Sequence, residues 1–284
     1  MIIKMNNKII NKVALITGSS RGIGKKISEN LAKSGYNIVI AAKTTEKNNK
    51  YDETIFDIKK NLEEKYNIEA LAVKTDLRKT DDINNLINET YKKFGRLDAL
   101  INNASALWWK NIIETPEKKY DLINNINSKA SFLLSRSAIE LMNKNDGGHI
   151  IMHSPPLPNP NDNSIYKNKT AYMISKLGMT ITALGISEEY KGKNISANTI
   201  WPATGIESDA TKVMKLGTEK DWRKPDIIAD CIKYILNEDK NTFTGNQLID
   251  EIYLKSKGVN DLSKYRCIKD HEPEKLINLF NKIY

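Results

Sequence analysis

Residues 12–24, KVALITGSSRGIG, join an apolar run to a turn that carries three glycines. Val13 to Ile16 predict a buried strand, and the pattern from Ile23 onward predicts a helix directly after the turn. Glycines let backbone N–H groups approach an anion closely, and a helix N-terminus adds a positive dipole end at the same place. The segment therefore predicts a site for a phosphorylated ligand.

The glycine spacing matches neither of two well-known phosphate-binding loops. TGxxxGxG at 17–24 differs from the GxGxxG of the general dinucleotide fingerprint. It is also not a nucleoside-triphosphatase loop, because Lys25 follows the last glycine and a second lysine, not Ser or Thr, comes next. Taken alone, the segment leaves open a glycine-rich turn without a ligand.

Composition indicates one globular domain over residues 1–284. Hydrophobic residues make up 40% and charged residues 28% of the chain, and no apolar run approaches the ~20 residues that span a bilayer. The opening MIIKMNNKIINK is too broken for a secretory signal, so we expect a cytoplasmic protein. Cys231 and Cys267 are far apart and the three histidines show no ligand spacing, so neither a disulfide nor a metal site is predicted.

The net charge of +9 raises the possibility of a nucleic-acid partner. The lysines, however, are spread among asparagines along the whole chain and form no basic stripe interleaved with aromatic residues. We therefore expect no nucleic-acid partner and no membrane insertion.

Short apolar runs alternate with longer amphipathic stretches, which is typical of βαβ units. We predict an α/β fold of the Rossmann type: a doubly wound, seven-stranded parallel sheet with helices on both faces. The strands are expected at 13–17, 37–41, 69–75, 99–102, 149–153, 194–200 and 247–250. The helices are expected at 23–34, 52–66, 80–94, 116–143, 170–190 and 225–236.

Local signals support these boundaries: Thr80 is expected to cap its helix, and Gly35 and Gly95 to end theirs. Two irregular regions, 155–163 and about 203–225, follow strand ends, where open α/β sheets bind ligands. They are expected to be substrate walls, with ordinary surface loops as the alternative. From about 251 to 284 we expect an extension, amphipathic at 273–283, that packs on the domain or on a partner subunit.

Tyr172 and Lys176, in YMISK, lie four residues apart within a predicted helix and so share one face. An adjacent ammonium favours the phenolate and is expected to lower the tyrosine pKa from its usual value of about 10. Tyr172 would then serve as an acid or base. Without other motifs, an exposed helix pair is the alternative.

Several motifs occur together in a fixed order: TGSSRGIG at 17–24, Asp76 in KTDL, NNAS at 102–105, Asn127 in NINS, and YMISK at 172–176. In these the chain resembles the short-chain dehydrogenases/reductases over nearly its full length. IAAKT at 40–44, SPPL at 154–157, WP at 201–202, and TGN and IDE between 244 and 251 are similar to the hydroxysteroid dehydrogenase-like protein 2 branch of that family. Longer members of the branch carry a sterol-carrier domain, which we do not expect here.

The resemblance implies which residues bind the cofactor and which take part in catalysis. Tyr172 would be the proton donor or acceptor, Lys176 would bind the nicotinamide ribose, and Asn127 would hold a water in the proton relay. The cofactor would be contacted by Gly18, Ser19, Ser20, Arg21, Gly22, Ile23, Gly24, Lys43, Asp76, Asn103 and Lys176. The helices containing Asn127 and Tyr172 would form a homodimer or homotetramer interface. For Asp76, Asn103 and Asn127, local capping or turn roles stay open.

Cofactor choice follows from the end of the second strand, where NAD-binding domains usually place an acidic residue. Here that strand ends in Ala41-Ala42-Lys43, and the first carboxylate is Glu46. Lys43 and Arg21 suit a 2′-phosphate, so we expect NADP before NAD, with a solvated surface lysine as the alternative at position 43.

The chain departs from the family after the fourth strand, where NNAS at 102–105 stands for the usual NNAG, and at the end of the fifth strand. Pro155 stands where the second serine usually polarises the substrate, and Ser154 precedes it; proline offers no donor. We keep Ser154 as a catalytic candidate. The leading hypothesis is an NADP-dependent oxidoreductase acting on a carbonyl or alcohol of a small, apolar, lipid-like molecule. The alternative is an NADP-binding regulatory or structural protein whose catalysis is impaired by Pro155.

Overall fold

The computed structural model describes residues 11–47, 52–161 and 163–276. Its main sheet has seven parallel strands in the order β3-β2-β1-β4-β5-β6-β9. The strands are β1 (Val13–Thr17), β2 (Asn37–Ala42), β3 (Ala70–Lys74), β4 (Ala99–Asn102), β5 (Gly148–His153), β6 (Ile195–Trp201) and β9 (Gln247–Ile249). The predicted doubly wound parallel fold is confirmed, and each predicted strand is present to within one or two residues.

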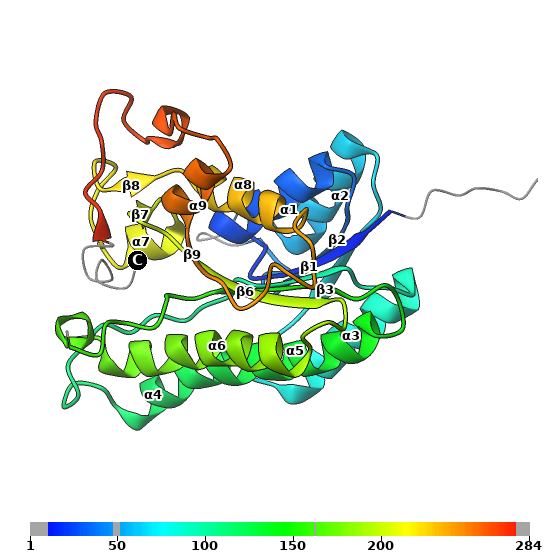
Figure 1. Cartoon of the computed structure of the whole chain (residues 1–284), viewed down its shortest axis with the longest axis horizontal. Coiled ribbons are helices and arrows are strands. Elements are labelled where there is room, and N and C mark those ends of the chain that lie inside the picture. The colour runs from blue at the N-terminus through cyan, green and yellow to red at the C-terminus, as the bar shows by residue number, and fades with distance from the viewer. Residues whose placement is uncertain (1–10, 48–51, 162, 277–284) are drawn as a thin grey trace, which may run out of the picture.

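Helices cover both faces of this sheet, as Figure 1 shows. On one face lie α1 (Gly22–Lys33), α2 (Ile55–Tyr66), α8 (Asp226–Ile235) and α9 (Asp250–Ser256). On the other face lie α3 (Thr80–Phe94), α5 (Ala130–Met142) and α6 (Thr170–Glu189), with α4 (Glu117–Asn124) beside α6.

The central strands are apolar throughout because both of their faces are buried. All four residues from Val13 to Ile16 are fully buried. Ala14 and Ile16 belong to the cluster under α1 and α8, whereas Val13 and Leu15 belong to the cluster under α3 and α5. The alternation of side chains along one strand thus serves two separate apolar layers.

The long helix expected at 116–143 contains a π-helical turn, Asn125–Lys129, between α4 and α5. Two further boundaries were wrong in detail. Lys79, not Thr80, is the N-cap of α3 and makes no side-chain cap bond, while Gly95 ends that helix in a left-handed conformation as expected. Residue 250 begins a helix instead of ending a strand: Ile249 is the N-cap of α9, and the Asp250 carboxylate accepts the Glu251 N–H in the first turn.

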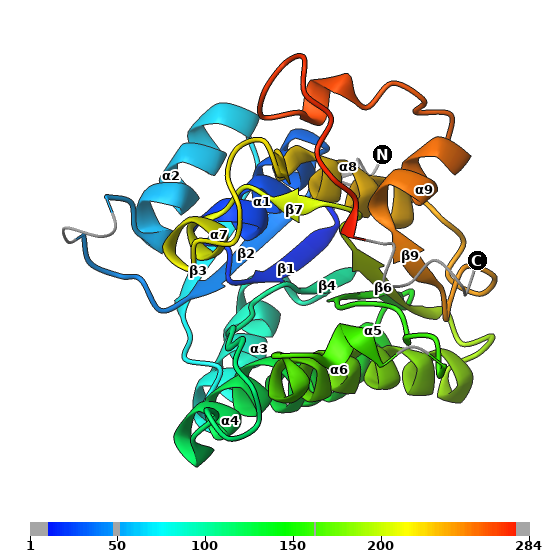
Figure 2. The same ribbon diagram turned by 90° about the vertical axis from the view of Figure 1, so that its left-hand side faces the viewer.

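The irregular region after residue 202 contains structure that the sequence pattern did not predict. β7 (Gly205–Ile206) pairs in parallel with β8 (Trp222–Arg223), and the short helix α7 (Asp209–Val213) lies between them. Ser208 caps α7 through a reciprocal bond with Thr211. Two-residue strands leave no periodicity to detect, which explains the omission. Figure 2 shows this unit above the carboxyl ends of the central strands.

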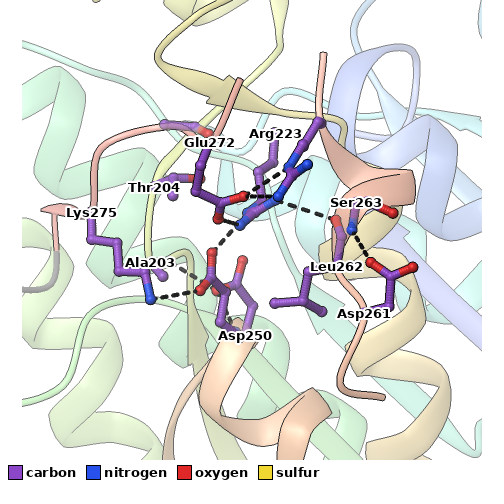
Figure 3. Close-up of polar contacts among 12 residues, drawn as sticks. Ala203, Thr204, Arg223, Asp250, Asp261, Leu262, Ser263, Glu272 and Lys275 are labelled. Carbon is purple, nitrogen blue, oxygen red and sulfur yellow. Dashed lines mark hydrogen bonds and ion pairs between the residues drawn. The ribbon is translucent and has the colours of Figure 1, made fainter. Parts of the chain in front are cut away.

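The chain after α9 packs on the same molecule as far as it is described. Its anchor is Arg223 in β8, whose side chain is fully buried. The Arg223 guanidinium donates to the Glu251 carboxylate at 2.7 Å and to the Leu262 carbonyl at 3.3 Å, and it pairs with Glu272 (Figure 3). Lys275 pairs with Glu251 at 3.2 Å. This Arg223 cluster ties the segment 262–275 to the β7–β8 unit.

The expected amphipathic segment at 273–283 lies largely outside the described residues. Its first described part bonds to the domain, since the Leu276 N–H donates to the Ala203 carbonyl at 2.7 Å. Ala203 in turn donates its N–H to the buried Asp250 carboxylate at 2.8 Å. The end of β6, the start of α9 and the C-terminal segment therefore meet at one place.

Removing Glu251 tests the Arg223 cluster. We expect Glu251→Ala to lower the free energy of unfolding by about 3 kcal/mol, because it leaves a buried guanidinium short of a partner. Urea denaturation measures the loss. Glu64→Ala is the matched control, since the Lys60–Glu64 pair is exposed (74% and 64%) and exposed pairs contribute less than ~1 kcal/mol. Equal effects in both variants would contradict a special role for the buried cluster.

Candidate active site

The glycine turn lies between the carboxyl end of β1 and the N-terminus of α1. Gly18 and Gly22 have φ angles of +67° and +52°, which glycine adopts without steric cost. A Cβ on Gly24 would overlap the Gly18 carbonyl oxygen and lie 2.7 Å from the Asn103 amide nitrogen. The glycines therefore allow the loop to fold tightly over the start of α1, where free backbone N–H groups favour an anion.

Thr17 and Asn103 join this turn to the end of β4. The Thr17 hydroxyl oxygen accepts the N–H groups of Asn103 and Ala104, each at 3.0 Å. The Asn103 side-chain amide donates back to the Thr17 carbonyl at 2.9 Å, and its oxygen lies 3.3 Å from Nδ1 of His153. These bonds fix the ends of β1 and β4, between which the strand order reverses and where α/β sheets bind ligands.

The other predicted residues of the turn have distinct surroundings. The buried Ser19 hydroxyl donates to the Ile16 carbonyl at 2.8 Å and accepts the Ala41 N–H at 3.0 Å, so it links the turn to β2. Ser20 is buried, and Ile23 is half-buried in the first turn of α1. The Arg21 guanidinium pairs with Asp209 of α7 at 3.1 Å.

Charged residues lie at the ends of β2 and β3. Lys43 is exposed directly after β2. Asp76 follows β3, and hydrogen bonds from Arg78 lower its pKa to about 2, with a smaller contribution from the positive charge of Lys43. The Asp76 carboxylate is therefore ionised, and it accepts both the Arg78 N–H and guanidinium at 3.1 Å and 2.9 Å.

Tyr172 lies in the first turn of α6 and is 5% exposed. Its ring packs edge-on against Trp109, with the centroids 6.1 Å apart, in an apolar cluster that includes Ile165. Burial raises the pKa of Tyr172 well above its usual value, and a hydrogen bond with Ser105 opposes the rise. The expectation that Lys176 lowers this pKa is therefore not met in this structure, because desolvation dominates.

Lys176 is also buried, at 2% exposure, and burial lowers its pKa to about 7. Its ammonium donates to the His153 carbonyl at 2.7 Å, at the end of β5. The Trp201 ring lies below it, with the centroid 5.7 Å from Nζ. The side chain is thus held at the carboxyl end of β5.

Asn127 lies in the π-helical turn and is fully buried. Its carboxamide accepts the Ala106 N–H at 2.8 Å, and it donates to the Ala106 carbonyl and the Ser175 hydroxyl, each at 2.9 Å. The side chain therefore fixes the backbone that follows β4. π-turns often occur at functional sites, because the extra residue redirects a side chain.

Ser154 is fully buried, and its hydroxyl faces α6. The Thr180 hydroxyl donates to the Pro155 carbonyl at 2.6 Å, and its oxygen lies 2.9 Å from the Ser154 hydroxyl oxygen, with which it shares a hydrogen bond. The hydroxyl of Ser154 thus joins β5 to α6.

Apolar side chains near the site divide into three groups. Trp108, Trp109, Ile165 and Tyr166 pack in the cluster around Tyr172. In the wall region expected after residue 202, Trp222 is buried and donates its indole N–H to the Leu216 carbonyl at 2.8 Å. Leu157, Val213 and Met214, in the two expected wall regions, are exposed.

Three residues near the site were not among the sequence predictions. Ser105 contacts Tyr172, His153 contacts Asn103, and Thr180 contacts Ser154. Burial and the nearby Lys176 charge lower the pKa of His153 to about 3, so its imidazole is neutral. The change from the usual NNAG to NNAS was a usable signal for Ser105, whereas His153 and Thr180 left none.

Across 11–47, 52–161 and 163–276, no cluster of His, Cys, Asp or Glu is suited to a metal ion. Over the same ranges, no helix has the length and apolarity needed to cross a bilayer.

Comparison with known proteins decides the family. A family model described as short chain dehydrogenase matches residues 12–217. The chain belongs to this family. It is 42% identical over 266 residues to hydroxysteroid dehydrogenase-like protein 2 of Xenopus tropicalis, covering 93% of this chain and 62% of that protein. The predicted resemblance to that branch is confirmed, and the chain spans about half to two thirds of the length of the relatives it matches.

Solved short-chain dehydrogenases share the fold. A putative dehydrogenase from Xanthomonas campestris is 31% identical, with a TM-score of 0.88 over 94% of this chain and 97% of that one. A metagenomic short-chain oxidoreductase crystallised with NADP is 25% identical, with a TM-score of 0.69 over 84% of this chain and 97% of that one.

The close packing at Gly24 predicts that a methyl group there is not tolerated. We expect Gly24→Ala to lower the free energy of unfolding by about 2 kcal/mol, because the displaced atoms are backbone and a hydrogen-bonded amide. The control is Gly185→Ala in α6, where a Cβ meets only the end of the Glu189 side chain at 4.0 Å. That change should stabilise the helix by up to ~1 kcal/mol. Urea unfolding of both variants checks the opposite signs.

Proposed function

We propose that this member of an oxidoreductase family uses NADP to transfer a hydride between nicotinamide and the carbonyl or alcohol carbon of a small apolar substrate. The observation that carries the proposal is the burial of Tyr172 and Lys176 on one helix face, with Lys176 bonded to the carboxyl end of β5. A buried phenol and a buried amine have few structural reasons to lie together there.

The residues fit a dinucleotide. The left-handed glycines leave the N-terminus of α1 open to a pyrophosphate, with Gly18, Arg21, Gly22, Ile23 and Gly24 around it and Ser19 and Ser20 in the same turn. Asp76 would meet the adenine, Asn103 would lie along the nucleotide, and Lys176 would bind the nicotinamide ribose. When bound, the nicotinamide supplies or accepts the hydride.

Tyr172 would exchange the proton at the substrate oxygen. Because burial raises its pKa, the hydroxyl is protonated at neutral pH. That state can donate to an oxygen as a carbonyl is reduced, and the phenolate would take the proton back when an alcohol is oxidised. Asn127 would take part by holding the Ala106 backbone, in addition to any bound water, and Lys176 would add positive charge beside the reacting groups.

NADP is favoured over NAD by the exposed Lys43 directly after β2. A 2′-phosphate at this position would gain an ammonium partner. The ionised Asp76 also lies near Lys43, but Arg78 already neutralises that carboxylate. The metagenomic relative with bound NADP is consistent with this choice.

An apolar substrate suits the aromatic surroundings of the reacting groups. Trp109 packs on Tyr172, and Trp201 lies edge-on to His153 with centroids 5.8 Å apart. A homodimer or homotetramer is proposed through α5 and α6, because Phe132, Ile174 and Ile181 are exposed there by 54%, 47% and 60%. Such a set of apolar side chains on neighbouring helices is typical of an interface.

One observation favours the second candidate, an NADP-binding regulatory or structural protein. The catalytic candidate Ser154 already binds Thr180, and Pro155 carries no donor. In such a protein NADP would bind, but hydride transfer would be slow or absent.

Replacing Tyr172 by Phe tests the leading proposal. The protein is assayed with NADPH against a panel of apolar ketones and aldehydes, and we expect Tyr172→Phe to lower kcat at least ~100-fold with little change in the Kd for NADPH. Equal turnover in the variant contradicts the assignment. NADPH binding without turnover in the unmodified protein supports the second candidate.

Replacing Lys43 by Ala tests cofactor choice. We expect the Kd for NADPH to rise about tenfold, because a charged hydrogen bond to the 2′-phosphate is lost, while the Kd for NADH stays unchanged. Fluorescence titration measures both constants. Lys33→Ala, at the exposed far end of α1, should change neither. A parallel loss of NADH binding in Lys43→Ala contradicts a 2′-phosphate contact.

A further inference from the structure

We propose that Ser105 is a catalytic residue whose hydroxyl binds the substrate oxygen together with Tyr172, in place of the serine that Pro155 has removed from β5. The inference rests on the reductase function proposed above and identifies its missing hydrogen-bond donor.

The backbone around Ser105 is fixed on both sides. Before it, the Ala104 N–H donates to the Thr17 hydroxyl at 3.0 Å. After it, Ala106 is held by Asn127 through both its N–H, at 2.8 Å, and its carbonyl, at 2.9 Å. A side chain between two such anchors has a defined position, which a catalytic donor needs.

The Ser105 hydroxyl contacts the reacting phenol. A hydrogen bond from Ser105 toward the Tyr172 oxygen opposes the rise in the pKa of that phenol, and the Ala106 carbonyl, 3.3 Å from the Ser105 hydroxyl, is a second acceptor for the same hydrogen. Ser105 can thus donate to either oxygen in the resting protein. It can turn its hydrogen toward a substrate oxygen on binding, since a hydroxyl rotates to suit its partners.

Ser105 and Ser154 differ in their exposure to solvent. Ser105 is exposed, so a substrate oxygen can reach it. Ser154 is fully buried, and its hydroxyl is already hydrogen-bonded to Thr180.

Two departures from the family pattern compensate for each other in this reading. Pro155 removes a hydroxyl from the end of β5, and Ser105 adds one at the end of β4, where the family usually has glycine. β4 and β5 are neighbouring parallel strands, with Asn102 opposite Met152. Both positions therefore lie at the same edge of the sheet, three residues beyond this pair.

The proposed reduction adds one hydride and one proton to the substrate carbonyl. The carbonyl carbon receives the hydride of NADPH, and the electrons of the C=O π bond move to oxygen. That oxygen takes the proton of the Tyr172 hydroxyl while Ser105 donates a hydrogen bond to it. The resulting phenolate is stabilised by the Ser105 hydroxyl and regains a proton from water. Loss of one such donor typically costs about 10²–10³ in kcat.

The activity test uses Ser105→Ala and Ser105→Thr in the full chain, with NADPH and a carbonyl substrate that the unmodified protein reduces. We expect Ser105→Ala to lower kcat about 100-fold with an unchanged Kd for NADPH, and Ser105→Thr to restore most of the rate. Ser34→Ala, at the exposed end of α1, is the matched control and should leave kcat unchanged.

A second readout does not depend on turnover. With 3-fluorotyrosine incorporated, the ¹⁹F signal of Tyr172 is assigned by its absence in Tyr172→Phe. We expect Ser105→Ala to shift this signal and raise its titration midpoint, because a hydrogen bond to the phenolate is lost. A purely structural effect of Ser105→Ala would not be restored by threonine in both readouts.

The results of these experiments distinguish a failure of the Ser105 role from a failure of the proposed function. If the unmodified protein reduces carbonyls but Ser105→Ala is equally active, or if Ser154→Ala loses more activity than Ser105→Ala, the role of Ser105 is refuted and the proposed function stands. An unmoved Tyr172 signal in Ser105→Ala also refutes it. If the unmodified protein binds NADPH and reduces no carbonyl, the proposed function itself fails and the role of Ser105 fails with it.

Discussion

The hydrogen bonds between Thr17 and the Asn103-Ala104 backbone are the constraint on which the site depends. They join the ends of β1 and β4, the two strands between which the sheet changes direction. Gly24 then has to lie against the Asn103 amide, with no room for a Cβ. From the same backbone the chain continues into Ser105 and Ala106, so the geometry of the glycine turn and that of the tyrosine site are set together.

Strong periodic signals made most of the fold predictable from sequence. β1 is apolar at every core position and buried on both faces, and α3 is amphipathic and ends at a glycine that adopts positive φ; both were predicted with their observed bounds. The β7–β8 unit was not predictable, because its strands are too short for a period and depend on tertiary anchors such as the buried Arg223.

The candidate site was predictable as a set of residues but less so as a set of contacts. Tyr172 and Lys176 share a helix face because their spacing requires it. The sequence could not give the degree of burial, however, and burial reverses the expected shift in the pKa of Tyr172. Likewise, the Ser154 hydroxyl is held by Thr180 and the backbone next to Ser105 by Asn127, and both partners are distant in sequence.

The π-helical turn at Asn125–Lys129 has a consequence for how this region tolerates change in length. An α-helix has 3.6 residues per turn, so the additional residue of the π-turn offsets the side chains of α4 from those of α5 by roughly a quarter of a revolution. Deleting one residue here would restore regular winding and rotate Asn127 away from Ala106, whereas an exposed substitution nearby would leave the phase intact. Insertions and deletions in this helix should therefore be tolerated as poorly as substitutions of Asn127 itself.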